Sequence, residues 1–163
     1  MNHLQILRSI PTLAQAAIGA GKLSEHERQR ELLPSKEAFE ALTWGEDFSI
    51  QQWRHLADAA NVSEMLTELQ IAGNLRHMVD DGHAAIAELI TSQQATGVWA
   101  ANADQLQRIN DMRFVFRIQL EHCSRRELDR AKHKVREFIR QVNAGKTPRN
   151  CTVHGQAVAT TSH

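Results

Sequence analysis

The strongest secondary-structure signal in the chain lies in residues 106–142, which read LQRINDMRFVFRIQLEHCSRRELDRAKHKVREFIRQV. Apolar residues recur in this segment every three or four positions, as on one face of an α-helix that packs against other helices. The recurring residues are Leu106, Ile109, Met112, Phe116, Leu120 and Cys123, followed by Leu128, Ala131, Val135, Phe138 and Val142.

Two signals bear on where this helix begins and ends. Asn143-Ala144-Gly145, followed by Pro148, is a typical helix stop. Ser124 and Glu127 have the spacing of a capping box, in which a serine and a glutamate satisfy the first amides of a helix. We therefore expect one long helix, with a break at Ser124 as the alternative.

A second helical stripe precedes this segment and extends from Val62 to Ile90. Its apolar residues stay in phase across Gly73-Asn74, so we expect one long helix, with a break near Gly73 as the alternative. Gly97 predicts the reversal between the two long helices. Ser49 and Gln52 form another capping box, and the helix that they begin is expected to close at Asn61.

The first 47 residues predict short helices joined by tight turns. A short helix is expected at residues 13–18, a capping box joins Ser24 and Glu27, and Pro34-Ser35 is expected to open a helix over residues 36–43. The sequence has no convincing strand pattern. We therefore predict an all-α fold with a short-helix N-terminal cap (1–47), a long antiparallel helical hairpin or bundle (48–145) and a flexible C-terminal tail (146–163).

Cysteine content and hydropathy indicate the compartment of the protein and whether it associates with a membrane. The 163 residues include only two cysteines, Cys123 and Cys151, without metal-ligand spacing, so both are expected to be free thiols. The N-terminus lacks the features of a signal peptide, and no segment approaches the roughly 20 apolar residues of a membrane span. These observations predict a soluble cytoplasmic protein that does not bind a membrane.

The zero net charge hides an uneven distribution. Residues 1–103 carry seven basic and thirteen acidic side chains, whereas residues 104–163 carry twelve basic and six acidic ones. The basic face of the last helix is either an electropositive surface for phosphates or an acidic protein, or the solvated side of an amphipathic helix, which the sequence favours. This face consists of Arg125, Arg126, Arg130, Lys132, Lys134, Arg136 and Arg140.

Residues 53–70 resemble a degenerate helix-turn-helix, with Asn61 at the turn. The presumed recognition helix carries Glu64 and Glu68 and no cation, whereas phosphate contacts normally supply most of the affinity for DNA. A DNA-binding regulator that uses this segment or the basic last helix is therefore an alternative that the sequence does not favour.

Histidine-rich segments suggest a metal site, but their spacing argues against it. His77 and His83, which flank Asp80 and Asp81, project in different directions from a helix. Asp129, His133 and Glu137 share one face, but they span about 12 Å along a helix, too far for a single ion. A metal-binding bundle is the second alternative, and we expect no cofactor.

The sequence offers no convergent catalytic group. Cys123 lies beside His122 and near Arg125, which could activate a thiolate, but it belongs to the apolar row and is predicted to be a buried structural cysteine. The chain contains no nucleophile elbow, P-loop or dinucleotide-binding glycine pattern. We therefore expect a protein that is not an enzyme.

Three segments carry a resemblance to other proteins: LLPSKEAF at residues 32–39, residues 53–66, and IQLEHCS at residues 118–124. They are similar to small uncharacterised helical proteins encoded in proteobacterial genomes, often near prophage or plasmid genes. The resemblance implies an accessory or regulatory protein of a mobile element. It assigns no activity and no binding residue.

These observations together predict a regulatory or interaction protein that presents a helical surface to a protein partner. Two long helices side by side bury only a narrow seam, so the remaining apolar groove invites a partner helix, and a homodimer is expected. Trp99 at the end of the hairpin could anchor a partner. The candidate interaction surface consists of Trp99, Arg125, Arg126, Arg130, Lys134 and Arg140.

Overall fold

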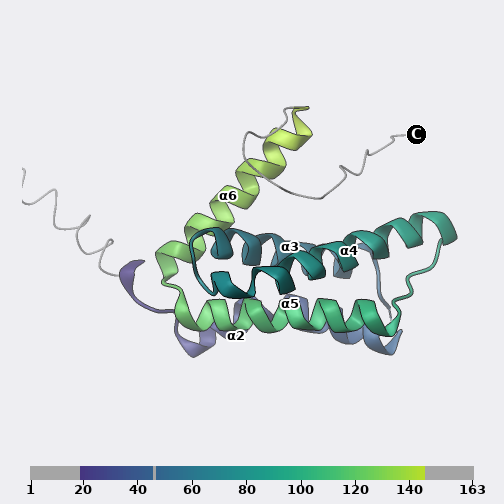
Figure 1. The fold of residues 1–163 in the computed structure, drawn as a ribbon, viewed down its shortest axis with the longest axis horizontal. Helices are drawn as coiled ribbons and strands as arrows, with labels where there is room; N and C mark the ends of the chain where they lie inside the picture. Colours follow the sequence, from purple (N-terminus) through teal and green to yellow (C-terminus); the bar gives the residue numbers. More distant parts are fainter. Residues whose placement is uncertain (1–18, 46, 146–163) are drawn as a thin grey trace, which may run out of the picture.

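The structure is a computed structural model that describes residues 19–45 and 47–145. Within these residues the chain forms helices and no strand, which confirms the predicted all-α bundle (Figure 1). The predicted helix at residues 13–18 and the predicted flexible tail at 146–163 lie outside the described residues. The elements are α2 (Glu25–Trp44), α3 (Ile50–Glu68), the 3₁₀ turn η1 (Gly73–Leu75), α4 (Arg76–Thr96), α5 (Ala103–His122) and α6 (Arg125–Asn143).

Helices α2 to α5 lie along a common direction, and α6 turns away from them at the end of α5 (Figure 1). The predicted antiparallel hairpin is formed by α4 and α5, which make the most extensive helix contact, and Gly97 caps α4 with a left-handed φ of 75°. Helix α3 is the centre of the bundle because it packs against α2, α4, α5 and α6. The direction in which α6 leaves therefore depends on its contact with α3.

The prediction of one long helix over the Val62–Ile90 stripe is wrong. Helix α3 runs straight through Asn61 and ends at Glu68, and α4 begins only at Arg76. The chain leaves α3 by placing Gln70 at φ 65°, where the amide of Ile71 donates to the carbonyl of Leu66 over 3.0 Å. Helices α3 and α4 each bury one apolar face against the other. Two such helices in a hairpin can show the same continuous apolar spacing in the sequence as one long helix.

The same geometry contradicts the helix-turn-helix interpretation of residues 53–70. That motif needs a turn at Asn61, but Asn61 lies in the middle of α3. Thr67, at a position where the motif needs an apolar anchor, is buried and donates its hydroxyl to the carbonyl of Ser63. The described structure therefore has no second helix in this segment that could enter a DNA groove as a recognition helix.

The expected short N-terminal helices are also wrong for residues 25–44, which form the single helix α2. Pro34 lies inside this helix, although an internal proline removes one backbone hydrogen bond and costs about 3 kcal/mol. Buried Ser35 donates its hydroxyl to the carbonyl of Leu32, and Ala38 and Leu42 are buried in the bundle. Packing of α2 on α3 and α5 thus outweighs the local signal of the proline.

The expectation of one long helix over residues 106–142 is wrong, because the chain breaks at Ser124 between α5 and α6. Cys123 and Ser124 are extended, and the Ser124 amide donates to the Glu127 carboxylate over 2.7 Å while the Glu127 amide donates to the serine hydroxyl. The chain around Gly21 supports this corner, because the carbonyl of Gly21 accepts the amide of Arg125. These contacts fix the point from which α6 departs.

The core has two parts along the bundle. One lies beneath α6 and contains Leu23, Ala59, Val62, Met65, Leu66, Phe116, Leu120, Cys123, Leu128, Ala131 and Val135. The other lies toward the α4–α5 turn and contains Ala38, Leu42, Leu56, Ala60, Ala85, Ile86, Leu89, Ile109 and Met112. Helix α6 contributes to the first part only, so its attachment depends on one half of its length.

Candidate interaction surface

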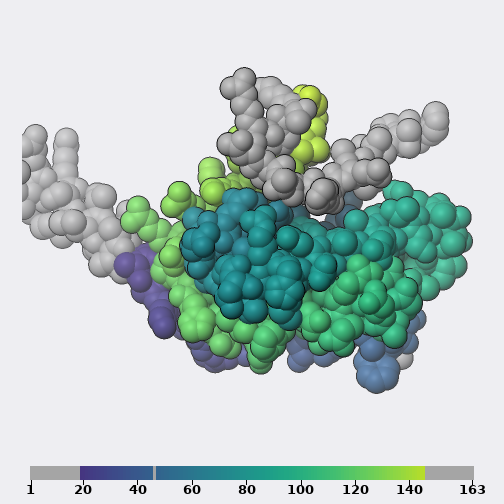
Figure 2. Space-filling model, in the orientation of Figure 1, coloured from purple at the N-terminus to yellow at the C-terminus, as the bar shows by residue number. Residues whose placement is uncertain are grey.

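Helix α6 is packed at its start and projects at its end. Leu128, Ala131 and Val135 are buried, whereas Ile139 is 40% exposed and Phe138 and Val142 are half-buried. Figure 1 shows the C-terminal part of the helix rising away from α3 and α4, and the visible part of its end (yellow) lies above them in Figure 2. We call Phe138, Ile139 and Val142 the α6 stripe, because they continue the apolar face of the helix beyond the contact with α3.

A groove runs along α3 beside this helix. It consists of two adjoining cavities of about 170 and 250 Å³, which share Asp58, Val62 and Lys132. We call it the α3–α6 groove. The remaining residues that line it are Glu31, Pro34, Ser35, His55, Ala59, Phe116, Val135, Arg136 and Ile139.

Much of the basic face of α6 is paired with acidic side chains of α2 and α3. Arg125 contacts Glu27, Lys132 Nζ lies 2.5 Å from a carboxylate oxygen of Glu31, and Lys134 Nζ lies 3.5 Å from one of Glu68. Hydrogen bonds from Ser24, together with Arg125, hold the pKa of Glu27 down at about 2. These cations therefore fasten α6 to the acidic part of the chain.

Two charged groups in the groove have no such partner. The guanidinium of Arg136 has no carboxylate within 4 Å in the described part of the chain, and its Nε donates only to the carbonyl of Lys132. The carboxylate of Asp58 makes no ion pair or hydrogen bond among the same residues. Burial raises the pKa of Asp58, against the influence of His55 and Arg54.

The structure does not bring the six predicted surface residues together. Arg125 and Lys134 are ion-paired with other helices, Arg140 is paired with Glu137 of its own helix over 2.6 Å, and Arg126 and Arg130 are exposed. Trp99 packs against Phe48, with ring centroids 5.2 Å apart, and belongs to the core near the α4–α5 turn. Its contacts are with the part of the core that α6 does not join.

Sequence reasoning missed the residues that the structure places around the groove. Asp58 and Ile139 were not singled out, and Arg136 was grouped with the whole basic face. On a helical wheel Ile139 lies at the edge of the apolar arc of α6, which is a weak signal for exposure. Only the break at Ser124, which turns α6 across α3, makes this edge the wall of a groove.

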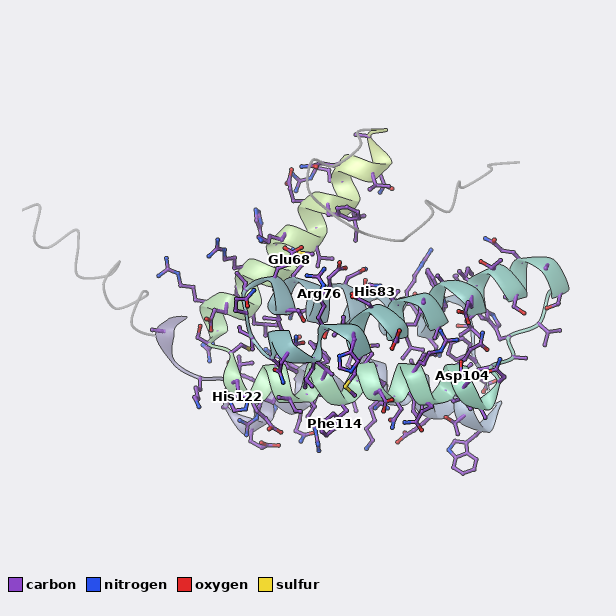
Figure 3. All side chains as sticks on the ribbon, viewed as in Figure 1. Glu68, Arg76, His83, Asp104, Phe114 and His122 are labelled. Atoms are coloured by element: carbon purple, nitrogen blue, oxygen red, sulfur yellow. The ribbon has the colours of Figure 1, made fainter. Side chains whose placement is uncertain are left out.

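A buried acid–base pair joins α3 and α4. Glu64 is only 6% exposed, and its carboxylate oxygen Oε2 lies 3.4 Å from Nε2 of His83. Burial, with the nearby carboxylates of Glu68 and Asp80, raises the pKa of Glu64 to about 7, and burial lowers the pKa of His83. Figure 3 shows His83 on the side of the bundle from which α6 rises.

The pair is not extended into a metal or nucleophilic site in the described residues. No group of three or more histidine, cysteine or acidic side chains converges there, so neither His77 with His83 nor Asp129 with His133 forms part of such a set. Cys123 is buried, as predicted, and burial raises its pKa to about 11, so the thiol stays protonated at neutral pH.

The Glu64 pair predicts a pH dependence of stability. Because the folded pKa of about 7 lies above the unfolded value of 4.5, stability from protonated Glu64 is present below about pH 4.5 and is lost as pH rises through 7. Glu64→Gln should therefore be more stable than the wild type by about 2 kcal/mol at about pH 8, and equal to it near pH 4.5.

Urea denaturation across this pH range measures the difference. His83 acts in the opposite sense, because its lowered pKa removes stability as pH falls below 6.5, and this contribution is present in both proteins. A difference between Glu64→Gln and wild type that stays constant with pH would show that Glu64 does not titrate in this way.

None of the helices in the described residues is both long enough and apolar enough to cross a membrane. In comparisons with known proteins, no family model, curated protein or solved structure matches the chain.

Proposed function

We propose that this chain is a non-enzymatic interaction protein that binds another polypeptide through the α6 stripe and the α3–α6 groove. The observation that carries this proposal is the projection of α6 beyond its own core while its apolar face continues. An uncovered helical face beside an apolar groove is the arrangement by which helix-in-groove recognition occurs.

The energetics of α6 support a binding role. Most of the stability of a helix in a protein comes from the packing of its apolar face, not from intrinsic propensity. The residues of α6 beyond Val135 have little of this packing, because Ile139 remains 40% exposed and Phe138 is only half-buried. A bound chain that covered the α6 stripe would supply the missing contact.

The chemistry of the groove also supports recognition. Its floor is formed by apolar side chains such as Val62 and Phe116, and Asp58 and Arg136 offer two charges for pairing. A small number of charged groups on an apolar surface makes a contact specific, while the buried apolar area supplies most of its affinity. The ion pairs to Glu27 and Glu31 hold the wall of the groove in place.

The proposal is tested by Ile139→Asp, which places a carboxylate in the α6 stripe. We expect binding to decrease at least tenfold, because an unpaired charge would be buried in the contact. The matched control is His133→Asp, which adds the same carboxylate to the exposed outer face of α6 and should bind like the wild type.

The three proteins are immobilised and exposed to the purified wild-type chain and, separately, to an extract of cells of the source organism. Circular dichroism checks that each variant remains helical. If wild type and Ile139→Asp retain the same chains in the same amounts from both samples, the surface does not bind protein and the proposal is wrong.

A further inference from the structure

We propose that the occupant of the α3–α6 groove is a second copy of this chain, held by a twofold arrangement in which each α6 stripe enters the groove of the other copy. This inference rests on the proposed function and names its partner. In such a dimer the two α6 helices lie antiparallel, and every contact between the copies occurs twice.

The charges of the groove carry the choice of partner. The groove contains one carboxylate, Asp58, and one guanidinium, Arg136, that have no ion-pair partner in the described residues. A surface with one unpaired acid and one unpaired base is complementary to itself, because a twofold rotation can set the acid of each copy against the base of the other. Asp58 would then pair with Arg136 of the partner subunit, and Arg136 with Asp58 of the partner subunit.

Two basic helices side by side would be expected to repel each other, and the ion pairs of α6 reduce this repulsion. On the groove side of α6, Arg125 and Lys132 are already paired with Glu27 and Glu31 of α2. Arg140 is paired with Glu137 in its own helix. Arg136 is therefore the cation of this side that remains for a partner in the described structure, and Asp58 is the carboxylate that suits it.

The α6 stripe of one copy is also apolar where it would meet the apolar part of the α3–α6 groove of the other copy. Ile139 both projects in the α6 stripe and lines the larger cavity with Val62 and Val135, so the same side chain belongs to the ligand and to the site. A second α6 laid antiparallel would place its Ile139 against these residues. The exposed parts of both stripes would be buried in one contact, in which aliphatic side chains are close-packed as in other helix pairs.

The experiment uses charge reversal in the full-length chain. Asp58→Arg and Arg136→Asp each set like charges against one another twice in the dimer, so each should raise the dimer dissociation constant roughly tenfold or more. The two variants mixed in equal amounts should form a heterodimer of near wild-type affinity, because both contacts become attractive again. The double variant Asp58→Arg, Arg136→Asp should also recover. Asp81→Arg, which reverses an exposed carboxylate on α4 that does not line the groove, is the control and should dimerise like the wild type.

Sedimentation velocity at several concentrations measures these five samples, the wild type and Ile139→Asp, with thermal unfolding as a check that each variant folds. Recovery in the mixture supports the dimer, since an ion pair within one chain cannot be restored by mixing. A wild type that remains monomeric while Ile139→Asp loses proteins from the cell extract would overturn the second copy as the partner and leave the proposed function standing. A dimer that is lost in Ile139→Asp but unaffected by the charge reversals would overturn the twofold arrangement. No association and no captured protein would overturn both.

Discussion

Replacing Gln119 by leucine is expected to lower the free energy of unfolding by about 3 kcal/mol, although the two side chains are similar in volume. Gln119 is completely buried on α5, and its amide joins α5 to α3 and to the turn after α3. The hydroxyl of Ser63 donates to its Oε1 over 2.6 Å. Its Nε2 lies 3.0 Å from the carbonyl of Ser63, 2.9 Å from the hydroxyl of Thr67 and 3.1 Å from the carbonyl of Ile71.

Leucine would leave these groups without a partner in the interior. The hydroxyl of Ser63 and the carbonyl of Ile71 would each carry a desolvation cost of about 1–3 kcal/mol. The carbonyl of Ile71 belongs to the segment that closes α3, so the loss also loosens the point at which the chain turns toward α4. Equilibrium urea denaturation measures the change.

The control is Gln107→Leu on the same helix, where the amide is exposed and donates a hydrogen bond to Asp111, four residues away. Its effect should stay within about 0.5 kcal/mol. If Gln119→Leu were as stable as Gln107→Leu, the buried hydrogen bonds would not hold α3, α5 and the turn together.

Gly82→Ala is expected to destabilise the protein by about 2 kcal/mol or more, although alanine favours helices. Gly82 is buried on α4 where this helix meets α5. A Cβ atom there would lie 2.3 Å from Cβ of Met112 and 3.3 Å from the carbonyl oxygen of Arg108. The atom in the way is next to the backbone of α5, so the two helices would have to move apart.

Helix propensity acts in the opposite direction. At an exposed helical site the same change would gain up to about 1 kcal/mol. Gly19→Ala is the control, because a Cβ there meets the side chain of Arg126 at an ordinary distance of 3.5 Å. Met112→Ala should not rescue Gly82→Ala, since alanine keeps the Cβ that causes the conflict. A Gly82→Ala protein that unfolds at a higher urea concentration than the wild type would contradict the close approach of α4 and α5.

Local capping signals in the sequence indicate three of the five α-helix starts in the described residues. The capping boxes at Ser24, Ser49 and Ser124 all form, and each needs residues only three positions apart. Gly45 and Gly97 end their helices in the left-handed conformation, which glycine adopts without steric cost. A further capping box of the same form, which the sequence predictions do not include, joins Asn102 and Gln105.

The predictions failed where contacts between distant segments outweigh local preference. Asn61 and Pro34 are both plausible helix boundaries, but both lie within helices that pack against their neighbours. The network around Gln119 joins residues 48 to 56 positions apart, which no periodic pattern reveals. The partners of the basic face could not be predicted for the same reason, because Glu27 and Glu31 lie about a hundred residues before Arg125 and Lys132.

The central claim is that another chain covers the α6 stripe, and amide hydrogen exchange tests it most directly. We predict that exchange in residues 136–143 slows as the protein is concentrated over about a hundredfold range, and that Ile139→Asp removes this dependence. Exchange in the α4–α5 hairpin should not change with concentration in either protein. If residues 136–143 of the wild type exchanged at one rate at every concentration, and adding cell extract did not slow them, nothing would cover the stripe and the account would be wrong.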